Sequence, residues 1–189
     1  NLVAALGSKG YKVLLVDIDP QGNTTSGLGV NKRNISKSSY DLLTGNARTQ
    51  EVIIQTEFAN VSIIPSSINL AGAEIELVSV EKREFLLKNA LEKIRDDFDF
   101  IFIDSPPSLG LITLNGLVAA DTVLVPVQCE YLALEGLSKL LNTIKIVKGN
   151  LNPSLEIEGF LLTMYMRNRL NNQVANEVRE HFGPLAYDT

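Results

Sequence analysis

The stretch that decides the fold is Val13 to Asn23, VLLVDIDPQGN, in which an apolar run ends in two carboxylates and a turn. Runs rich in Val, Leu and Ile are typical of strands covered on both faces, and Pro with Gly marks a turn. In open α/β sheets, ligands bind outside the carboxyl ends of the strands. Alternation along the strand end puts Asp17 and Asp19 on the same side, within reach of a metal ion or a water molecule. The structural alternative is that both carboxylates cap the following segment.

A second stretch, Phe100 to Ser108, FIFIDSPPS, repeats this form, because another apolar strand ends in an acid. This is the form of a Walker B element, whose Asp binds Mg²⁺ through the water shell of an ion that dehydrates reluctantly. Pro106 and Pro107 stiffen the following loop and so fix the position of Asp104. One such strand is weak evidence, and two in one chain strengthen the case for a phosphate and metal site.

Outward from these strands, short apolar runs alternate with amphipathic segments, the pattern of βα units around a mainly parallel sheet. The predicted strands are Lys12–Val16, Val61–Ile64, Phe100–Ile103, Val123–Val127 and Ile157–Met164. Apolar residues spaced by three and four predict three helices, two between these strands and one after the last. Their stripes are Leu87, Leu91, Ile94 and Phe98 within Glu84–Phe98; Leu134, Leu137, Leu141, Ile144 and Val147; and Leu170, Val174, Val178 and Phe182. The fold class is therefore α/β, with helices on both faces of the sheet.

Composition limits the function. The 189 residues, 45% hydrophobic and 21% charged, fit one globular domain over 1–189, and no run is long and apolar enough to span a bilayer. A net charge of −5 argues against a surface that is basic throughout. Cys129 and His181 are the only residues of their kinds, which excludes a zinc cluster and fits a reducing compartment. We expect Cys129 in the core and His181 on a helix face.

Three blocks carry a resemblance to a known family. They are DIDPQGNTTSGLGV at Asp17–Val30, FIFIDSPPSLGLITLNGLVAAD at Phe100–Asp121, and VLVPVQCEYLALEGL at Val123–Leu137. In this order and spacing they resemble the ParA, Soj and MinD group of deviant-Walker ATPases, and most closely its ParA/Soj branch. The resemblance extends over nearly the whole chain. It implies a P-loop NTPase-like fold of the SIMIBI type, with ATP and Mg²⁺ as cofactors.

The same resemblance implies roles for individual residues. Asp19 is similar to the acid that orients the attacking water, Asp17 to a supporting acid near the magnesium, and Asp104 to the Walker B acid. Gln21 is similar to a residue facing the phosphates or a dimer partner, and Pro106 lines the same crevice by adjacency. Acids placed around a metal and a water suit phosphoryl transfer, in which catalysis is mostly positioning and charge stabilisation.

The chain departs from the family pattern in two places. The family's KGGVGKTT-like loop is absent, and it would stand shortly before Asn1, together with a central strand. We therefore expect a fragment that leaves a gap in its own sheet and lacks activity without the loop. Where the family often reads TMYDGRTN, this chain reads TMYMRNRLN from Thr163, with Met166 and Arg167 in place of Asp and Gly. Adenine contacts are accordingly not assigned.

The leading hypothesis is an ATPase switch for chromosome or plasmid partitioning. The resemblance implies an ATP-bound homodimer, non-specific DNA binding through a patch built by the dimer, and a ParB/Spo0J-like protein that stimulates hydrolysis. It also implies a cytoplasmic, nucleoid-associated protein with no membrane partner. The alternative is a non-catalytic interaction module that keeps the fold and has lost nucleotide binding.

Overall fold

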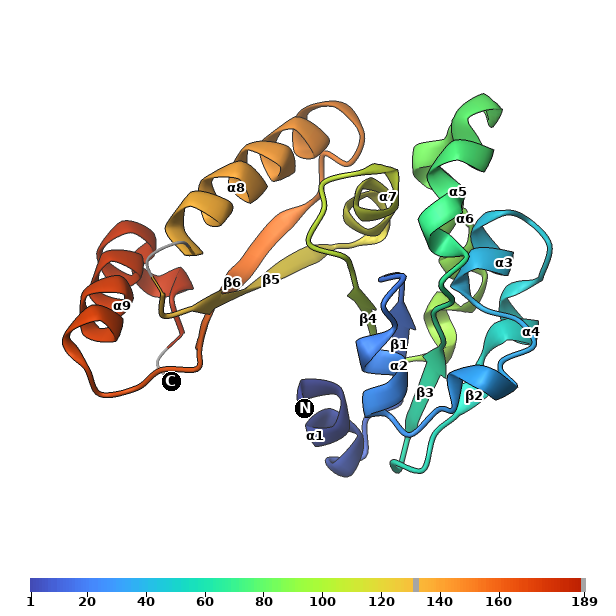
Figure 1. Cartoon of the computed structure of the whole chain (residues 1–189), viewed down its shortest axis with the longest axis horizontal. Coiled ribbons are helices and arrows are strands. Elements are labelled where there is room, and N and C mark those ends of the chain that lie inside the picture. The colour runs from blue at the N-terminus through green and yellow to red at the C-terminus, as the bar shows by residue number, and fades with distance from the viewer. Residues whose placement is uncertain (131–132, 188–189) are drawn as a thin grey trace. The chain divides into compact units, whose positions relative to one another are not determined.

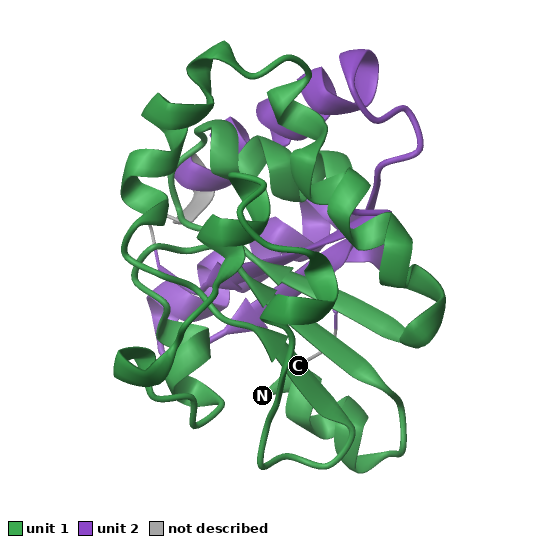
Figure 2. Ribbon diagram, turned by 90° about the vertical axis from the view of Figure 1, so that its right-hand side faces the viewer, with its two compact units in different colours: residues 1–119 green, residues 120–189 purple. Residues whose placement is uncertain are grey.

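The computed structural model describes residues 1–130 and 133–187, with the side chains of 133–135 excepted. The predicted position of Leu134 in a helix stripe lies outside the described side chains. The chain forms two compact units, Asn1–Ala119 and Ala120–Thr189, shown in separate colours in Figure 2. Each unit is described by itself, and the single domain expected over 1–189 stays a prediction.

Unit 1 is built on a four-stranded sheet in the order β2-β3-β1-β4 (Figure 1). Strands β3, β1 and β4 are parallel, and the short β2 pairs antiparallel with β3. The bounds are Val13–Asp17 for β1, Ile54–Gln55 for β2, Val61–Ile64 for β3 and Phe100–Asp104 for β4. The three predicted strands of this unit form with their ends shifted by no more than one residue. Strand β2 was not predicted, because two residues are too few for a periodic signal.

Helices cover both faces of this sheet, as predicted. One cluster packs Leu14, Val16 and Ile18 against apolar side chains of α3, α5, α6 and α7. The other packs Val13 and Leu15 against α1 and residues near α2. The helices are α1 Leu2–Ser8, α2 Asn23–Gly27, α3 Ser39–Leu43, α4 Thr49–Val52, α5 Leu70–Glu76, α6 Leu86–Leu91 and α7 Leu111–Ala119. Short 3₁₀ turns occur at Lys32–Asn34 (η1), Leu77–Ser79 (η2), Arg83–Phe85 (η3) and Glu92–Asp97 (η4).

The helix predicted over Glu84–Phe98 forms as α6 flanked by the 3₁₀ turns η3 and η4. Its apolar stripe is nevertheless correct, because Leu87, Leu91 and Ile94 are buried and Phe98 packs against the same core. Asn115 of α7 explains part of the change from the 3₁₀ turn η3 to the α-helix α6. Its Oδ1 accepts from Leu87 N at 3.1 Å and its Nδ2 donates to Arg83 O at 2.9 Å, so it satisfies backbone groups where η3 meets α6.

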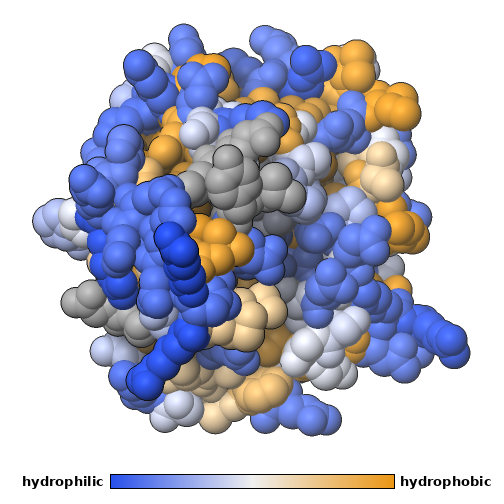
Figure 3. Space-filling model, turned by 60° about the vertical axis from the view of Figure 1, so that its left-hand side comes forward, coloured by the Kyte–Doolittle hydropathy of each residue, from blue (hydrophilic) through white to orange (hydrophobic). Residues whose placement is uncertain are grey.

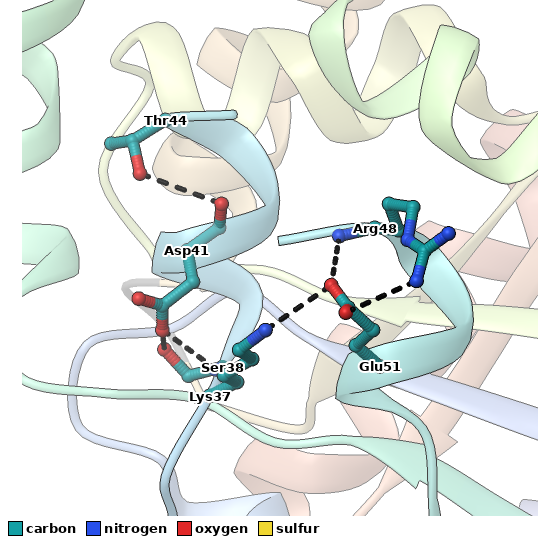
Figure 4. Close-up of polar contacts among 6 residues, drawn as sticks. All are labelled: Lys37, Ser38, Asp41, Thr44, Arg48 and Glu51. Atoms are coloured by element: carbon teal, nitrogen blue, oxygen red, sulfur yellow. Dashed lines mark hydrogen bonds and ion pairs between the residues drawn. The ribbon is translucent and has the colours of Figure 1, made fainter. Parts of the chain in front are cut away.

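Helices α3 and α4 begin with side-chain caps that lie close together (Figure 4). Before α3, Asp41 Oδ2 accepts from Ser38 N at 2.8 Å. Before α4, Glu51 Oε2 accepts from Arg48 N at 2.9 Å and pairs with Lys37 Nζ at 3.1 Å. Carboxylates in a first turn satisfy the backbone donors that a helix leaves unpaired. These contacts hold the pKa of Glu51 down at about 2, chiefly through the Arg48 backbone N–H.

Unit 2 pairs β5 (Thr122–Gln128) in parallel with β6 (Glu156–Thr163) and adds α8 (Ala133–Asn150), α9 (Arg169–Phe182) and the turn η5 (Gly183–Leu185). Its core holds Val125, Val127, Phe160, Leu162 and Val178. Cys129 is buried as expected, and His181 is exposed on α9. The prediction for Leu170 was wrong, because this side chain is 46% exposed and its neighbour Asn171 is buried. Asn171 caps the preceding loop by accepting from Met166 N at 2.7 Å and donating to Cys129 O.

Several strands keep an edge without a partner strand. Among the residues that the structure describes, β2 pairs only with β3, β4 only with β1, and β5 only with β6. The gap expected in the sheet stays a prediction. Within the same described part of the chain, no helix has the length and apolar character needed to cross a bilayer. Hydrophilic residues cover most of the face in Figure 3, and apolar ones gather in separate patches.

Candidate functional site

Two acids meet at the carboxyl edge of the unit 1 sheet. Strands β1 and β4 run parallel, and Asp17 at the end of β1 is in register with Asp104 at the end of β4. The turn after β1, which carries Asp19 and Gln21, is held to β4 because Ile18 N donates to Asp104 O at 2.8 Å. The sheet therefore brings the acids of the two predicted motifs together.

Asp17 is fully buried and holds the turn that follows it. Its Oδ2 accepts from Thr25 N at 2.8 Å and from Thr25 Oγ1 at 2.7 Å, and its Oδ1 accepts from Asp19 N at 3.1 Å. Burial raises the pKa of Asp17, the Thr25 hydrogen bonds oppose that rise, and the nearby Asp104 carboxylate adds to it. Asp17 thus caps the start of α2, as the structural alternative described, while lying at the predicted site.

Asp19 is half-buried, and its carboxylate is engaged on one side only. Oδ1 accepts from Gln21 N at 3.0 Å, and the Asp19 carbonyl accepts from Gly22 N at 2.8 Å and from Ser66 Oγ. Oδ2 has no hydrogen-bond donor among residues 1–130 and 133–187. Because the turn fixes the Asp19 carboxylate and leaves Oδ2 without a donor, Oδ2 can accept a hydrogen bond from a reactant.

Asp104 is half-buried and accepts a hydrogen bond from Thr24 Oγ1. The loop after it is fixed by Thr113 of α7, whose Oγ1 donates to Ser108 O at 2.5 Å and lies 3.4 Å from Pro106 O. Pro106 is half-buried in this loop. The loop that carries the Walker B-like acid is therefore held by both prolines and by a hydroxyl.

Gln21 contributes its backbone to the site. Its N–H donates to Asp19, and its carbonyl accepts from Lys32 Nζ, while the residue as a whole is exposed. Gly22 follows at φ 58°, and a Cβ there would lie 3.1 Å from Lys32 Cε. Glycine is the residue that takes this backbone conformation at low cost and leaves room for the lysine. Lys32 therefore places a cation at this turn.

Sequence reasoning missed three hydroxyl residues that connect the acids. Thr24 contacts Asp104, Thr25 contacts Asp17, and Thr25 Oγ1 also accepts from Ser66 N at 2.9 Å. Thr24 and Thr25 stand in the quoted DIDPQGNTTSGLGV block and could have been found from it. Ser66 follows β3, and nothing local in its sequence pointed to the turn after β1.

The donor set fits a magnesium ion better than a transition metal. Within the described residues, no group of three or more His, Cys, Asp or Glu side chains is placed to hold a metal. Asp104, Thr24 and the open oxygen of Asp19 are hard oxygen donors. Mg²⁺ takes one or two carboxylates and completes its shell with water and phosphate oxygens.

The mainly parallel sheet with helices on both faces is the α/β fold of the P-loop NTPase class. A family model described as "AAA domain" matches residues 1–157. The sporulation initiation inhibitor protein Soj of Bacillus subtilis is 53% identical over all of this chain and 75% of its own length. The chromosome partitioning protein ParA of Myxococcus xanthus is 50% identical over all of this chain and 67% of its own. The chain belongs to the ParA/Soj family of partitioning ATPases.

A solved structure agrees with the fold. It is a Mycobacterium smegmatis protein titled cobyrinic acid a,c-diamide synthase, with bound ADP and magnesium. It matches with a TM-score of 0.90 and 41% identity, over 96% of this chain and 74% of its own. The activity in its name differs from partitioning. The similarity supports the fold of this chain and the binding of nucleotide within the family.

Proposed function

We propose that this chain binds ATP and Mg²⁺ at the carboxyl edge of β1 and β4 and serves as the hydrolytic part of a partition switch. The observation that carries the proposal is the in-register pair Asp17 and Asp104, with the open carboxylate oxygen of Asp19 on the adjoining turn. Open α/β sheets bind their ligands outside the carboxyl ends of the strands, and both acids stand at such ends.

Each residue has a distinct part in this proposal. Bound Mg²⁺ would neutralise charge on the phosphates. Asp104 and the Thr24 hydroxyl would hold the cation and its water shell. Asp17 would act as a supporting acid without direct contact, because both of its oxygens already accept hydrogen bonds. Asp19 would orient the attacking water through Oδ2.

In the same proposal, Gln21 and Pro106 hold other groups of the site in position. The Gln21 N–H fixes the Asp19 carboxylate, and its exposed side chain is available to phosphates or to a dimer partner. Pro106 holds the loop after Asp104. Groups fixed before the reaction lower the cost of reaching the transition state.

The partners proposed for the switch follow from its relatives' roles. They are a second copy of the chain, non-specific DNA held by the ATP-bound dimer, and a ParB/Spo0J-like protein that stimulates hydrolysis. Exposed Arg167 and Arg169, which precede and begin α9, support a basic patch. The protein would act in the cytoplasm on the nucleoid, and its cargo would be a chromosome or a plasmid.

Calorimetric titration with ATP, with and without Mg²⁺, tests the nucleotide site. The titration would compare two proteins: the present chain, and a longer chain in which a strand and a KGGVGKTT-like loop are added before Asn1. We expect Mg²⁺-dependent binding by the extended chain, weakened at least about tenfold by Asp104→Asn, since loss of a metal-site group costs that much. Asp96→Asn, an exposed acid on η4, is the matched control. Absence of binding by both chains would favour the interaction module.

A further inference from the structure

Lys32 lies over the turn that carries Asp19. Its Nζ donates to Gln21 O, although the two residues are 11 positions apart in the chain. Its side chain also covers Gly22, because a Cβ at that position would lie 3.2 Å from Lys32 Nζ and 3.4 Å from Ser66 Cβ. Gly22 is accordingly buried, while Lys32 itself is exposed. The lysine therefore covers the turn and places a cation on one of its carbonyls.

The backbone that carries Lys32 is held in place. Val30 packs against the apolar cluster that includes side chains of β1, and its N–H donates to Thr25 O at 3.2 Å. Asn31 Oδ1 accepts from Arg33 N at 3.0 Å and so caps the turn η1, in which Lys32 is the first residue. The side chain of Lys32 therefore starts from a fixed point beside the site turn.

The Lys32 contact is linked to Asp19 through one peptide group. The carbonyl of the peptide between Gln21 and Gly22 accepts from Lys32. The N–H of the same peptide donates to Asp19 O at 2.8 Å, and Ser66 Oγ donates to that carbonyl as well. A cation on the carbonyl polarises the peptide and so strengthens the hydrogen bond that its N–H donates. Lys32 thus acts on the backbone that orients the Asp19 carboxylate.

We propose that Lys32 is a positioning residue for Asp19 in ATP hydrolysis. It holds the turn from Asp19 to Gly22 closed, so that Asp19 Oδ2 keeps the direction in which it accepts from the attacking water. A misplacement of about 1 Å can cost about a hundredfold in rate, so a contact outside the reacting groups can control turnover. This role in the reaction rests on the proposed function, and the contact of Lys32 with the turn does not.

Hydrogen exchange of the Gly22 amide, followed by NMR, tests the contact without nucleotide. Lys32→Met removes the cation and keeps most of the side chain. We expect exchange at least about threefold faster in this variant, because the hydrogen bond from Gly22 N to Asp19 O weakens. Arg33→Met is the matched control, because it makes the same charge change in η1 and the Arg33 side chain has no hydrogen bond or ion pair within residues 1–130 and 133–187.

ATP turnover by the chain carrying the KGGVGKTT-like loop tests the role in the reaction. We expect Lys32→Met to lower kcat at least about tenfold while the Kd for ATP changes less than about twofold, because the residue orients a catalytic group and does not bind substrate. Lys32→Arg, which keeps a cationic donor, should recover most of the rate. Arg33→Met should leave kcat unchanged, and urea titration checks that every variant folds.

The possible results are distinguishable. Unchanged Gly22 exchange in Lys32→Met would overturn the inference at the contact itself. Faster exchange with unchanged kcat would overturn the positioning role, as would equal losses of kcat in Lys32→Met and Arg33→Met or a loss of ATP affinity as large as the loss of kcat. Absence of turnover in the parent chain would refute the proposed function and the positioning role with it, and the exchange measurement would still decide the contact.

Discussion

Replacing Thr25 by Val tests whether the buried hydroxyl holds the site turn. Thr25 is fully buried, and its Oγ1 donates to Asp17 Oδ2 at 2.7 Å and accepts from Ser66 N at 2.9 Å. Valine keeps the β-branched shape, so the change removes the hydroxyl with little change in volume. Losing a hydrogen bond to a charged group costs about 1.5–3 kcal/mol, and a buried donor left unpaired costs about 1–3 kcal/mol.

With partial relaxation, we expect Thr25→Val to lower the free energy of unfolding by about 3 kcal/mol. Urea titration followed by circular dichroism measures this. Thr44→Val is the control, because the half-buried Thr44 hydroxyl bonds only to nearby residues, donating to Tyr40 O at 2.9 Å and accepting from the exposed Asn46 Nδ2 at 2.9 Å. The free energy of unfolding of that variant should fall by less than about 1 kcal/mol. Equal losses in the two variants would refute the reasoning.

The loss in Thr25→Val should also depend on pH. Burial raises the pKa of Asp17 above its usual 3.8, and the Thr25 hydroxyl opposes that rise, so the pKa should rise further in the variant. A carboxyl whose pKa is raised by folding favours the folded state below its unfolded pKa, and this contribution is lost as pH rises through the folded pKa. The loss should therefore be largest at neutral pH and smaller below pH 3.8. A loss that grows on acidification would contradict this assignment.

Two further predictions concern other parts of the chain. Hydrogen bonds from the Arg48 backbone N–H and from the Lys37 and Arg48 side chains lower the pKa of Glu51 from 4.5 to about 2, so the stabilisation from Glu51 is present above pH 4.5 and lost as pH falls through about 2. Glu51→Gln should differ from the parent in urea titrations at pH 6 and match it near pH 2, and an equal difference at both pH values would contradict this pKa. Gly7→Ala places a Cβ 2.4 Å from Ala59 O and should destabilise by about 1–3 kcal/mol. Gly149→Ala in α8, with open space around it, should instead stabilise by up to about 1 kcal/mol, and equal effects would exclude the steric account.

The strands and the position of the site acids could be predicted because their signals are local. Buried parallel strands read as continuous apolar runs, and an acid directly after such a run lies at the ligand-binding edge. Asp17 and Asp104 follow from this rule, and their adjacency from the pairing of β1 with β4. The predicted apolar stripes of the helices were mostly correct, because their periodicity is also a local signal.

The parts that sequence reasoning missed depend on contacts between distant residues. Ser66 joins the turn after β1 from a separate strand, and Asn115 caps a helix start 28 residues before it. Leu170 fits the periodicity of α9 but lies at its first turn, where the buried position falls to Asn171. The exposed Ile75 and Val78 show the opposite limit, because periodicity alone does not tell a buried apolar row from an exposed one.

The most direct test of the central claim is the rate of Mg²⁺-dependent ATP hydrolysis by the chain carrying the KGGVGKTT-like loop, with Asp19→Ala beside it. The account predicts slow turnover that the substitution abolishes while ATP binding is kept, because Asp19 orients water through an oxygen that the fold leaves open. Asp96→Ala should leave turnover unchanged. Unchanged turnover in the Asp19 variant would contradict the account and remove this residue from the chemistry.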